Sequence, residues 1–246
     1  MNPFSRKPLL LLQLLAGTLL LAGCDNDDVI VATPTPPPPP PAMATFEVTV
    51  TNLTNAQPLS PVAVIAHAEG YSVFSVGTPA TVGLEDLAEG GDNTALLAEA
   101  DADTNVVATA SGAAPIGPAG SEAISFEILE SELPGLLLST STMLVNTNDA
   151  ITMLNAAPVE NLAVGESLTM RTIAYDAGTE ANTELAAHIP GPAGGGEGFN
   201  AARDDVDVVA MHIGVVGQDG GFPASSLDGQ HRFDNPVAQV RIERVE

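Results

Sequence analysis

Basic residues are scarce in this chain, and their scarcity excludes several classes of partner. Seven Lys and Arg stand against 31 Asp and Glu, and the net charge is −24 at pH 7. Arg6 and Lys7 both precede residue 24, so the rest of the chain has no lysine at all. Nucleic-acid phosphates are met by Lys and Arg, which excludes nucleic acid as a partner. Anionic lipid surfaces are excluded in the same way unless metal ions bridge the charges, and the acids predict a well-hydrated surface.

Cysteine and catalytic motifs are also lacking. Cys24 is the only cysteine, which excludes a disulfide framework. No serine lies in a Gly-x-Ser-x-Gly elbow, and the glycine-rich run 191–198 has no phosphate-loop lysine, so we interpret that run as a flexible surface loop. The histidines include no i,i+4 pair and do not have zinc-site spacing; they are His67, His188, His212 and His231. We expect no enzyme, and a hydrolase with an unrecognised site is the less favoured alternative.

The N-terminus has the pattern of an export signal at residues 1–23. A positive start, Arg6-Lys7, precedes an apolar stretch from Leu9 to Leu21 that is short for a membrane span. The stretch ends in Leu21-Ala22-Gly23-Cys24, which resembles the lipobox of bacterial lipoproteins. That resemblance implies cleavage before Cys24, a lipid on its thiol, and anchoring to a bacterial membrane at its periplasmic face or at the cell surface.

Residues 24–44 are expected to be a disordered tether. Pro34 and the run Pro36–Pro41 favour polyproline II, and the acids near Cys24 favour solvation. At about 3.1 Å per residue the tether reaches up to roughly 60 Å. A ligand for a proline-binding module is the alternative, and a spacer is favoured beside a lipid anchor.

Residues 45–246 have the pattern of one all-β domain. Phe46–Thr51 alternates apolar and polar residues, as a strand with one wet face does. Short turns rich in Gly, Pro and Asn separate the expected strands, which points to an antiparallel sandwich, and one short helix is expected at 84–89. The other expected strands are 62–66, 106–110, 123–129, 136–145, 168–175, 208–215 and 237–245.

Two oxygen-rich segments each follow an apolar run. Asn146–Asp149 follows one, and Ala174–Glu184 groups carboxylates and other oxygen ligands around Gly178. Calcium takes about 6–8 oxygens, so two loops that converge can form its site. The alternative is turn chemistry, because Asp and Asn side chains bond to nearby backbone N–H groups in loops.

Four segments, in order, resemble the spondin domain family of animal matrix proteins and bacterial lipoproteins. The fourth, Tyr175-Asp176-Ala177-Gly178-Thr179-Glu180, is the most specific. The other three are Leu59–Pro61 with Val64–His67, Phe74–Ala80 with Gly83–Gly91, and Ser141–Asp149. The resemblance spans about residues 45–245.

The resemblance implies an antiparallel eight-stranded β-sandwich, similar to calcium-dependent membrane-binding domains, with one or two short helices. It also implies a calcium site at Asp149, Asp176 and Glu180. Animal domains have Ser-Pro-Asp-Trp where this chain has Thr147-Asn148-Asp149-Ala150, and they usually have aspartate in place of Glu180. Their disulfides are absent here.

From the sequence we expect a lipid-anchored cell-envelope protein with a calcium-binding domain, acting as a binding or adhesion module. Its partners would be the membrane, through Cys24, and an extracellular protein or polysaccharide. The alternative is a structural envelope protein with no dedicated ligand. Exposed apolar groups beside the calcium loops would favour the adhesion module, whereas loops with only Ala, Gly and acids would favour the structural protein.

Overall fold

Strand β1 (Met43–Asn52) shows how the sequence pattern becomes structure. In the computed structural model, which describes residues 39–203 and 206–246, every second residue from Ala44 to Asn52 is buried and those between are half-exposed. Strand side chains alternate between two faces, so one face of β1 packs into the core. The strand begins at Met43, slightly before the expected domain start. The expected signal, Cys24 and most of the tether lie outside the described residues.

Nine antiparallel strands and two helices make up the described domain, so the expected all-β antiparallel fold is confirmed. Eight strands follow the order β3-β2-β5-β6-β7-β9-β1-β4, and β8 pairs with β7. The strands after β1 are β2 (Ala63–His67), β3 (Val106–Ser111), β4 (Ser121–Leu129), β5 (Leu137–Met143), β6 (Ala150–Pro158), β7 (Ser167–Asp176), β8 (Ala210–Met211) and β9 (Ala238–Arg244).

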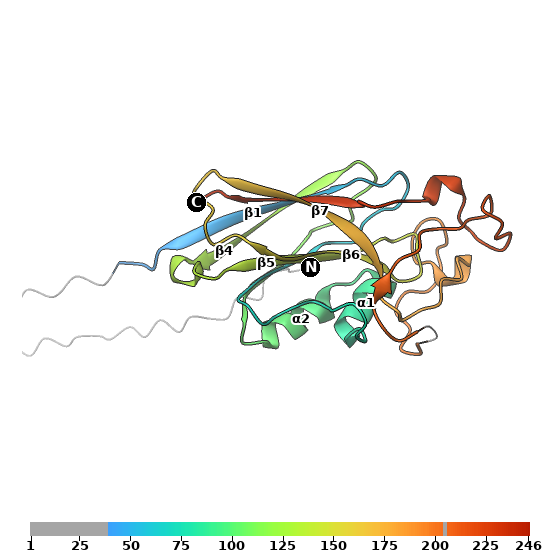
Figure 1. Cartoon of the computed structure of the whole chain (residues 1–246), viewed down its shortest axis with the longest axis horizontal. Helices are drawn as coiled ribbons and strands as arrows, with labels where there is room; N and C mark the ends of the chain where they lie inside the picture. The colour runs from blue at the N-terminus through green and yellow to red at the C-terminus, as the bar shows by residue number, and fades with distance from the viewer. Residues whose placement is uncertain (1–38, 204–205) are drawn as a thin grey trace, which may run out of the picture. The chain divides into compact units, whose positions relative to one another are not determined.

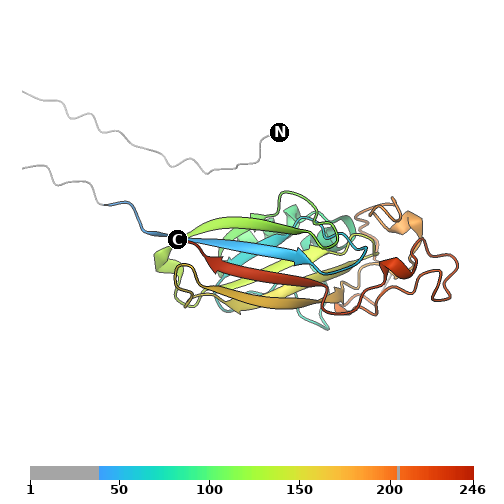
Figure 2. The same cartoon turned by 90° about the horizontal axis from the view of Figure 1, so that it is seen from above.

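Strand β7 joins the two layers seen in Figure 1. Its residues 167–172 pair with β9, whereas residues 173–176 pair with β6. One layer therefore contains β3, β2, β5 and β6, and the other contains β9, β1 and β4, which lie side by side in Figure 2. This geometry brings the end of β7 to the start of β6.

The main core lies between the layers. Phe46 of β1 stacks on Phe126 of β4 with ring centroids 5.7 Å apart, and Leu138, Leu154 and Ile242 pack in the same cluster. A second apolar cluster lies under the helices, where Ile65 and Ile151 belong to strands and Leu84, Leu87 and Leu96 to the helices. Burial of this apolar surface is the main force that holds the helices on the sheet.

Helix α1 (Val82–Gly90) matches the expected helix, and α2 (Thr94–Ala102) was not predicted. The Thr81 hydroxyl accepts a hydrogen bond from Leu84 N, and Gly91 ends α1 in the left-handed conformation with φ 71°. Among the described residues, no helix is long and apolar enough to cross a membrane.

Two long connections gather at the end of the sandwich where β6 begins and β7 ends (Figure 1). Only two residues of the expected strand 208–215 form a strand, because β8 ends at Met211 and Gly214 then turns the backbone with φ 87°. That expected strand was therefore wrong beyond residues 210–211. Short 3-10 helices occur at Glu130–Glu132, Ala186–His188 and Gly229–His231.

Candidate metal and binding site in the strand-end loops

Strand pairing brings Asp149 and Asp176 to neighbouring positions. Ala150, the first residue of β6, pairs with Asp176, the last residue of β7. Ala177 N then donates to the Asp149 carbonyl at 3.3 Å. The two oxygen-rich segments noted in the sequence therefore meet at one end of the sandwich.

Asp149 is fully buried, and its carboxylate organises the loop after β7. Its Oδ2 accepts hydrogen bonds from Thr179 N at 2.9 Å, from Glu180 N at 3.2 Å and from the Thr179 hydroxyl at 3.4 Å. A buried carboxylate needs such donors because leaving it unpaired is costly. Asp149 thus joins the β5–β6 connection to the β7 loop.

Asp176 binds within its own loop. Its Oδ1 accepts from Gly178 N at 2.9 Å, and its Oδ2 accepts from Asn182 Nδ2 at 2.5 Å. Gly178 has φ 72°, and a Cβ there would lie 2.2 Å from the Val208 carbonyl oxygen. Glycine is therefore required at this position for both reasons.

Glu180 lies in the same loop but faces another partner. Its Oε1 is 3.9 Å from His188 Nδ1. Within residues 39–203 and 206–246, no three His, Cys, Asp or Glu side chains are grouped closely enough to hold a metal ion. The structure therefore places the three expected ligands in one pair of loops but does not group their carboxylates as a metal site, and those of Asp149 and Asp176 bind N–H groups instead. All three side chains offer carboxylate oxygens, which are the ligand atoms that calcium prefers.

Glu184, the last residue of the second oxygen-rich segment, is a key residue of this end although it was not among the expected metal ligands. Its side chain is buried; Oε1 accepts from Val216 N at 2.6 Å, and Oε2 accepts from Gly217 N at 2.8 Å and the Ser225 hydroxyl at 2.6 Å. Its own N–H donates to Asn148 Oδ1 at 3.1 Å. Glu184 thus connects two segments, because its backbone N–H binds the Asn148 side chain and its carboxylate binds residues 216–225, more than 30 positions further along the chain.

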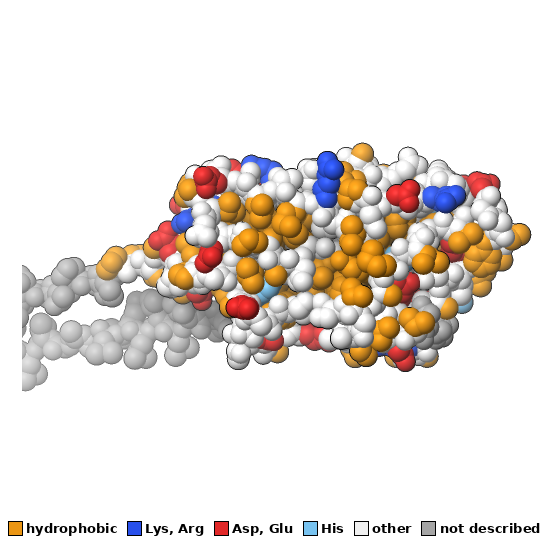
Figure 3. All heavy atoms as spheres, in the orientation of Figure 1, with side chains coloured by type: hydrophobic (Ala, Val, Ile, Leu, Met, Phe, Trp, Pro, Cys, Tyr) orange, Lys and Arg blue, Asp and Glu red, His pale blue; other side chains and the backbone are white. Residues whose placement is uncertain are grey.

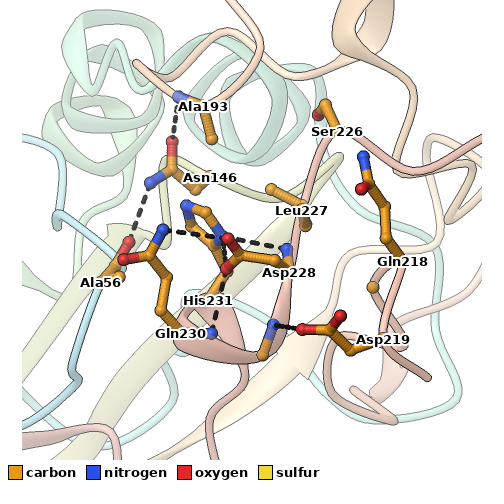
Figure 4. Close-up of polar contacts among 12 residues, drawn as sticks. Ala56, Asn146, Ala193, Gln218, Asp219, Ser226, Leu227, Asp228, Gln230 and His231 are labelled. Carbon is orange, nitrogen blue, oxygen red and sulfur yellow. Dashed lines mark hydrogen bonds and ion pairs between the residues drawn. The ribbon is translucent and has the colours of Figure 1, made fainter.

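A second polar network fixes the outer loops, as Figure 4 shows. The Asn146 side chain donates to the Ala56 carbonyl at 2.8 Å and accepts from Ala193 N at 3.0 Å. Asp228 Oδ1 lies 2.9 Å from His231 Nδ1, and Gly229 N donates to Asp219 Oδ2 at 3.1 Å. The Asn146 contacts hold two distant loops against the segment before β6, and the other two contacts fix the loop at residues 219–231.

The glycine-rich run 191–198 is a surface loop without a helix or strand, as expected, and three of its glycines pack closely against neighbouring backbone. A Cβ on Gly191 would lie 2.3 Å from the Val145 carbonyl oxygen. On Gly194 it would lie 2.4 Å from the Ile189 oxygen, and on Gly196 2.3 Å from Ala187 carbonyl atoms. Glycine at these three positions lets neighbouring backbone segments approach more closely than a side chain would allow.

His212 is buried beside the Asp176 loop. Its Nδ1 accepts a hydrogen bond from Gly214 N at 2.9 Å, so the neutral ring carries its proton on Nε2. It borders a water-sized cavity of about 10 Å³ with Asn148, Asn182 and Glu184. Burial lowers the pKa of the His212 imidazole, and the carboxylates of Asp176 and Glu184 oppose that shift.

The lowered pKa predicts a pH dependence of stability. The unfolded chain takes up a proton at His212 near pH 6.5, whereas the folded chain does so only at lower pH. The free energy of unfolding should therefore fall as the pH drops below about 6.5, by up to about 1.4 kcal/mol per pH unit. Urea unfolding of the wild type and His212→Gln between pH 7.5 and 5, in chelator, measures it. Parallel pH profiles for the two proteins would contradict the assignment.

Exposed apolar side chains lie beside these acidic loops. Ile213 is 83 % exposed, Val206 63 % and Met211 49 %, and Met211 pairs with Tyr175 next to Asp176. Val76 is 59 % exposed, and its neighbour Gly77 donates to Val209 O at 2.8 Å. Apolar side chains gather on the face that carries the end of β7 and β8 (Figure 3).

No protein-family model matches the chain, and no curated protein matches it.

Proposed function

We propose that this chain is an exported lipoprotein of the bacterial cell envelope whose spondin-like β-sandwich is a calcium-dependent binding or adhesion module. Cys24 would hold it on the membrane, and the tether would carry the domain outward. The loop end with Asp149, Asp176 and Glu180 would bind calcium and present a surface to an extracellular protein or polysaccharide.

The convergence of the two oxygen-rich loops supports the calcium site. Asp149 and Asp176 come from paired strands, and Glu180 N bonds to the Asp149 carboxylate. The three carboxylates are not grouped as a metal site without the ion, so the loops would have to bring them together on binding, and a divalent cation would offset their mutual repulsion. Calcium would supply charge neutralisation and cross-link the loops, while Asp149, Asp176 and Glu180 would provide the oxygens.

The exposed apolar residues beside these loops carry the proposal of a binding surface. Met211 is the last residue of β8, which pairs with β7, and Ile213 lies two positions after it. Val206 and Val76 lie in adjoining segments. Exposed apolar groups gathered beside polar ones are typical of interaction sites. A loop end bearing only small and acidic residues would instead have favoured a structural role.

A structural envelope protein without a dedicated ligand is the second candidate. It is favoured by the hydrogen bonds already made by Asp149 and Asp176, since N–H donors satisfy these carboxylates as they do in ordinary turns. A hydrolase has less support: the Ser139 hydroxyl lies 2.8 Å from His67 Nε2, but both residues are fully buried in the sheet.

Calcium should stabilise the isolated domain, residues 40–246. With a Kd of about 10⁻⁴–10⁻³ M for an extracellular module, a tenfold excess of calcium adds about 1.4 kcal/mol to the free energy of unfolding. For a domain of this size that raises Tm by roughly 3–6 °C. Magnesium should do less because it dehydrates reluctantly. Thermal melts across a calcium titration at constant ionic strength measure the effect.

Asp176→Asn should remove most of the calcium shift, because it deletes one ligand charge. The matched control is Asp219→Asn, an exposed aspartate at the same end whose change removes the same charge. It should keep the wild-type shift. If both variants keep the shift, or if magnesium equals calcium, the effect is general screening by the acidic surface and the second candidate is favoured.

A further inference from the structure

A groove lies between helix α2 and the turn at residues 70–73. Its volume is about 260 Å³. Strand β2 ends at His67, opposite Leu137 at the start of β5, whereas Asp149 follows the end of β5. The groove is therefore at the other end of β5 from the candidate calcium loops and forms a separate site.

The groove combines an apolar floor with acidic and phenolic groups. Val73, Leu96 and Ala100 are buried and border it, and Tyr71, Glu99 and Asp103 also line it. Burial raises the pKa of Tyr71 to about 12, and the negative charges of Asp103 and Glu99 contribute. The phenol therefore stays neutral at physiological pH, while both carboxylates act on it electrostatically.

The two carboxylates are only partly satisfied. Glu99 Oε1 accepts from Gly83 N at 2.8 Å, and Asp103 Oδ1 accepts from Asn105 N at 2.8 Å. Within the part of the chain that the structure describes, neither carboxylate forms an ion pair, and Glu99 Oε2, Asp103 Oδ2 and the Tyr71 hydroxyl form no hydrogen bond. The groove thus offers three oxygen atoms and two negative charges to a ligand.

We propose that this groove binds an alkylammonium group, as found in a free primary amine or in a lysine side chain of a partner. An ammonium has three N–H donors, which match the three oxygens, and its charge offsets the two carboxylates. The Tyr71 ring adds a cation–π contact, and the alkyl chain would cover Val73, Leu96 and Ala100. This site is independent of calcium and goes beyond the function proposed above.

Titration with n-butylammonium chloride at constant ionic strength tests the proposal, with backbone amide shifts of the 15N-labelled domain as the readout. We expect saturable shifts at residues 70–73 and 96–103 with a millimolar Kd. Asp103→Asn and Glu99→Gln keep an oxygen for their backbone partners, so both should fold and weaken binding at least fivefold. Tyr71→Phe should weaken it less.

The control is Asp101→Asn, an exposed acid on the same helix that bonds to the Thr109 hydroxyl and does not line the groove. It should bind like the wild type. Equal shifts with sodium, shifts spread over the whole acidic surface, or equal weakening in the control would overturn the site.

Two further arms separate the ligand sources and the two proposals. Nα-acetyl-lysine methylamide binding as tightly as butylammonium assigns the groove to a protein lysine, whereas binding tenfold weaker assigns it to a free amine. Saturating calcium should leave the butylammonium Kd unchanged. The result of the butylammonium titration is therefore independent of the result of the calcium titration, and each proposal can be refuted without the other.

Discussion

Replacing Glu184 by alanine is expected to lower the free energy of unfolding by about 3 kcal/mol or more. The change leaves three donors without their acceptor: Val216 N, Gly217 N and the Ser225 hydroxyl. Gly217 and Ser225 are buried, so water cannot readily replace the carboxylate. A loss of that size corresponds to a fall in Tm of roughly 6–12 °C for this chain length.

Two further variants separate the hydrogen bonds from the charge. Glu184→Gln keeps one acceptor oxygen but turns an NH2 toward N–H donors, so it should lose an intermediate amount. Glu197→Ala changes an exposed glutamate and should stay near the wild type. Urea unfolding and hydrogen exchange at the 216 and 217 amides measure the outcomes. If Glu184→Ala matches Glu197→Ala in both stability and exchange, then Glu184 does not hold the loop.

The sequence could predict the regular part of the fold because that part depends on local patterns. The alternation from Ala44 to Val50 is visible in the residues themselves, and the structure buries one face of β1 accordingly. The proximity of the loops at Asp149 and Asp176 could also be predicted from the sequence. Each residue follows an apolar run, and antiparallel pairing brings the start of one strand beside the end of its neighbour.

Strand β6 and helix α2 were missed for different local reasons. Residues 150–154 of β6 are all buried and show no alternation, so the period-two signal is absent. In α2, Ala95, Leu97 and Ala98 are good helix formers, yet only Leu96 and Ala100 of the helix are buried, and the apolar stripe is too narrow to stand out.

The loop end could not be predicted because its contacts are long-range. Glu184 bonds to residues 32 to 41 positions away, and Asn200 N donates to Glu89 Oε2 across 111 positions. Arg203 forms a 2.6 Å ion pair with the buried Glu85 of α1, again far along the chain. No local motif encodes these pairings, because loop backbone is satisfied by whichever side chains the fold brings near.

These long-range contacts bear on what calcium could do here. Asp149 already receives three N–H and O–H donors through one oxygen, and Glu184 fixes the neighbouring loop independently. The loop end is thus held by hydrogen bonds before any ion is considered. We therefore expect the domain to fold without calcium. Calcium should add only a small increment to the free energy of unfolding, which is why the predicted rise in Tm is a few degrees.

The largest functional effect is expected at Cys24, where serine should abolish membrane attachment through lipid. A lipid chain contributes about 0.8 kcal/mol per buried CH2, and two chains suffice for stable anchoring. The chain after Cys24 has no lysine and a large excess of acids, so it cannot replace the anchor by attraction to anionic lipid. Loss of the Cys24 thiol should therefore remove membrane attachment completely rather than in part.

Labelling with a clickable fatty acid in a bacterial host measures this directly. The wild type should carry label and sediment with membranes, and Cys24→Ser should carry none. An uncleaved leader could hold the variant on the membrane, so its mass must be read alongside its fractionation, since residues 1–23 would then remain. Ala32→Ser introduces the same side chain into the tether and should label fully. Equal labelling of Cys24→Ser and Ala32→Ser would refute the anchor and, with it, the placement of the domain at the cell envelope through lipid.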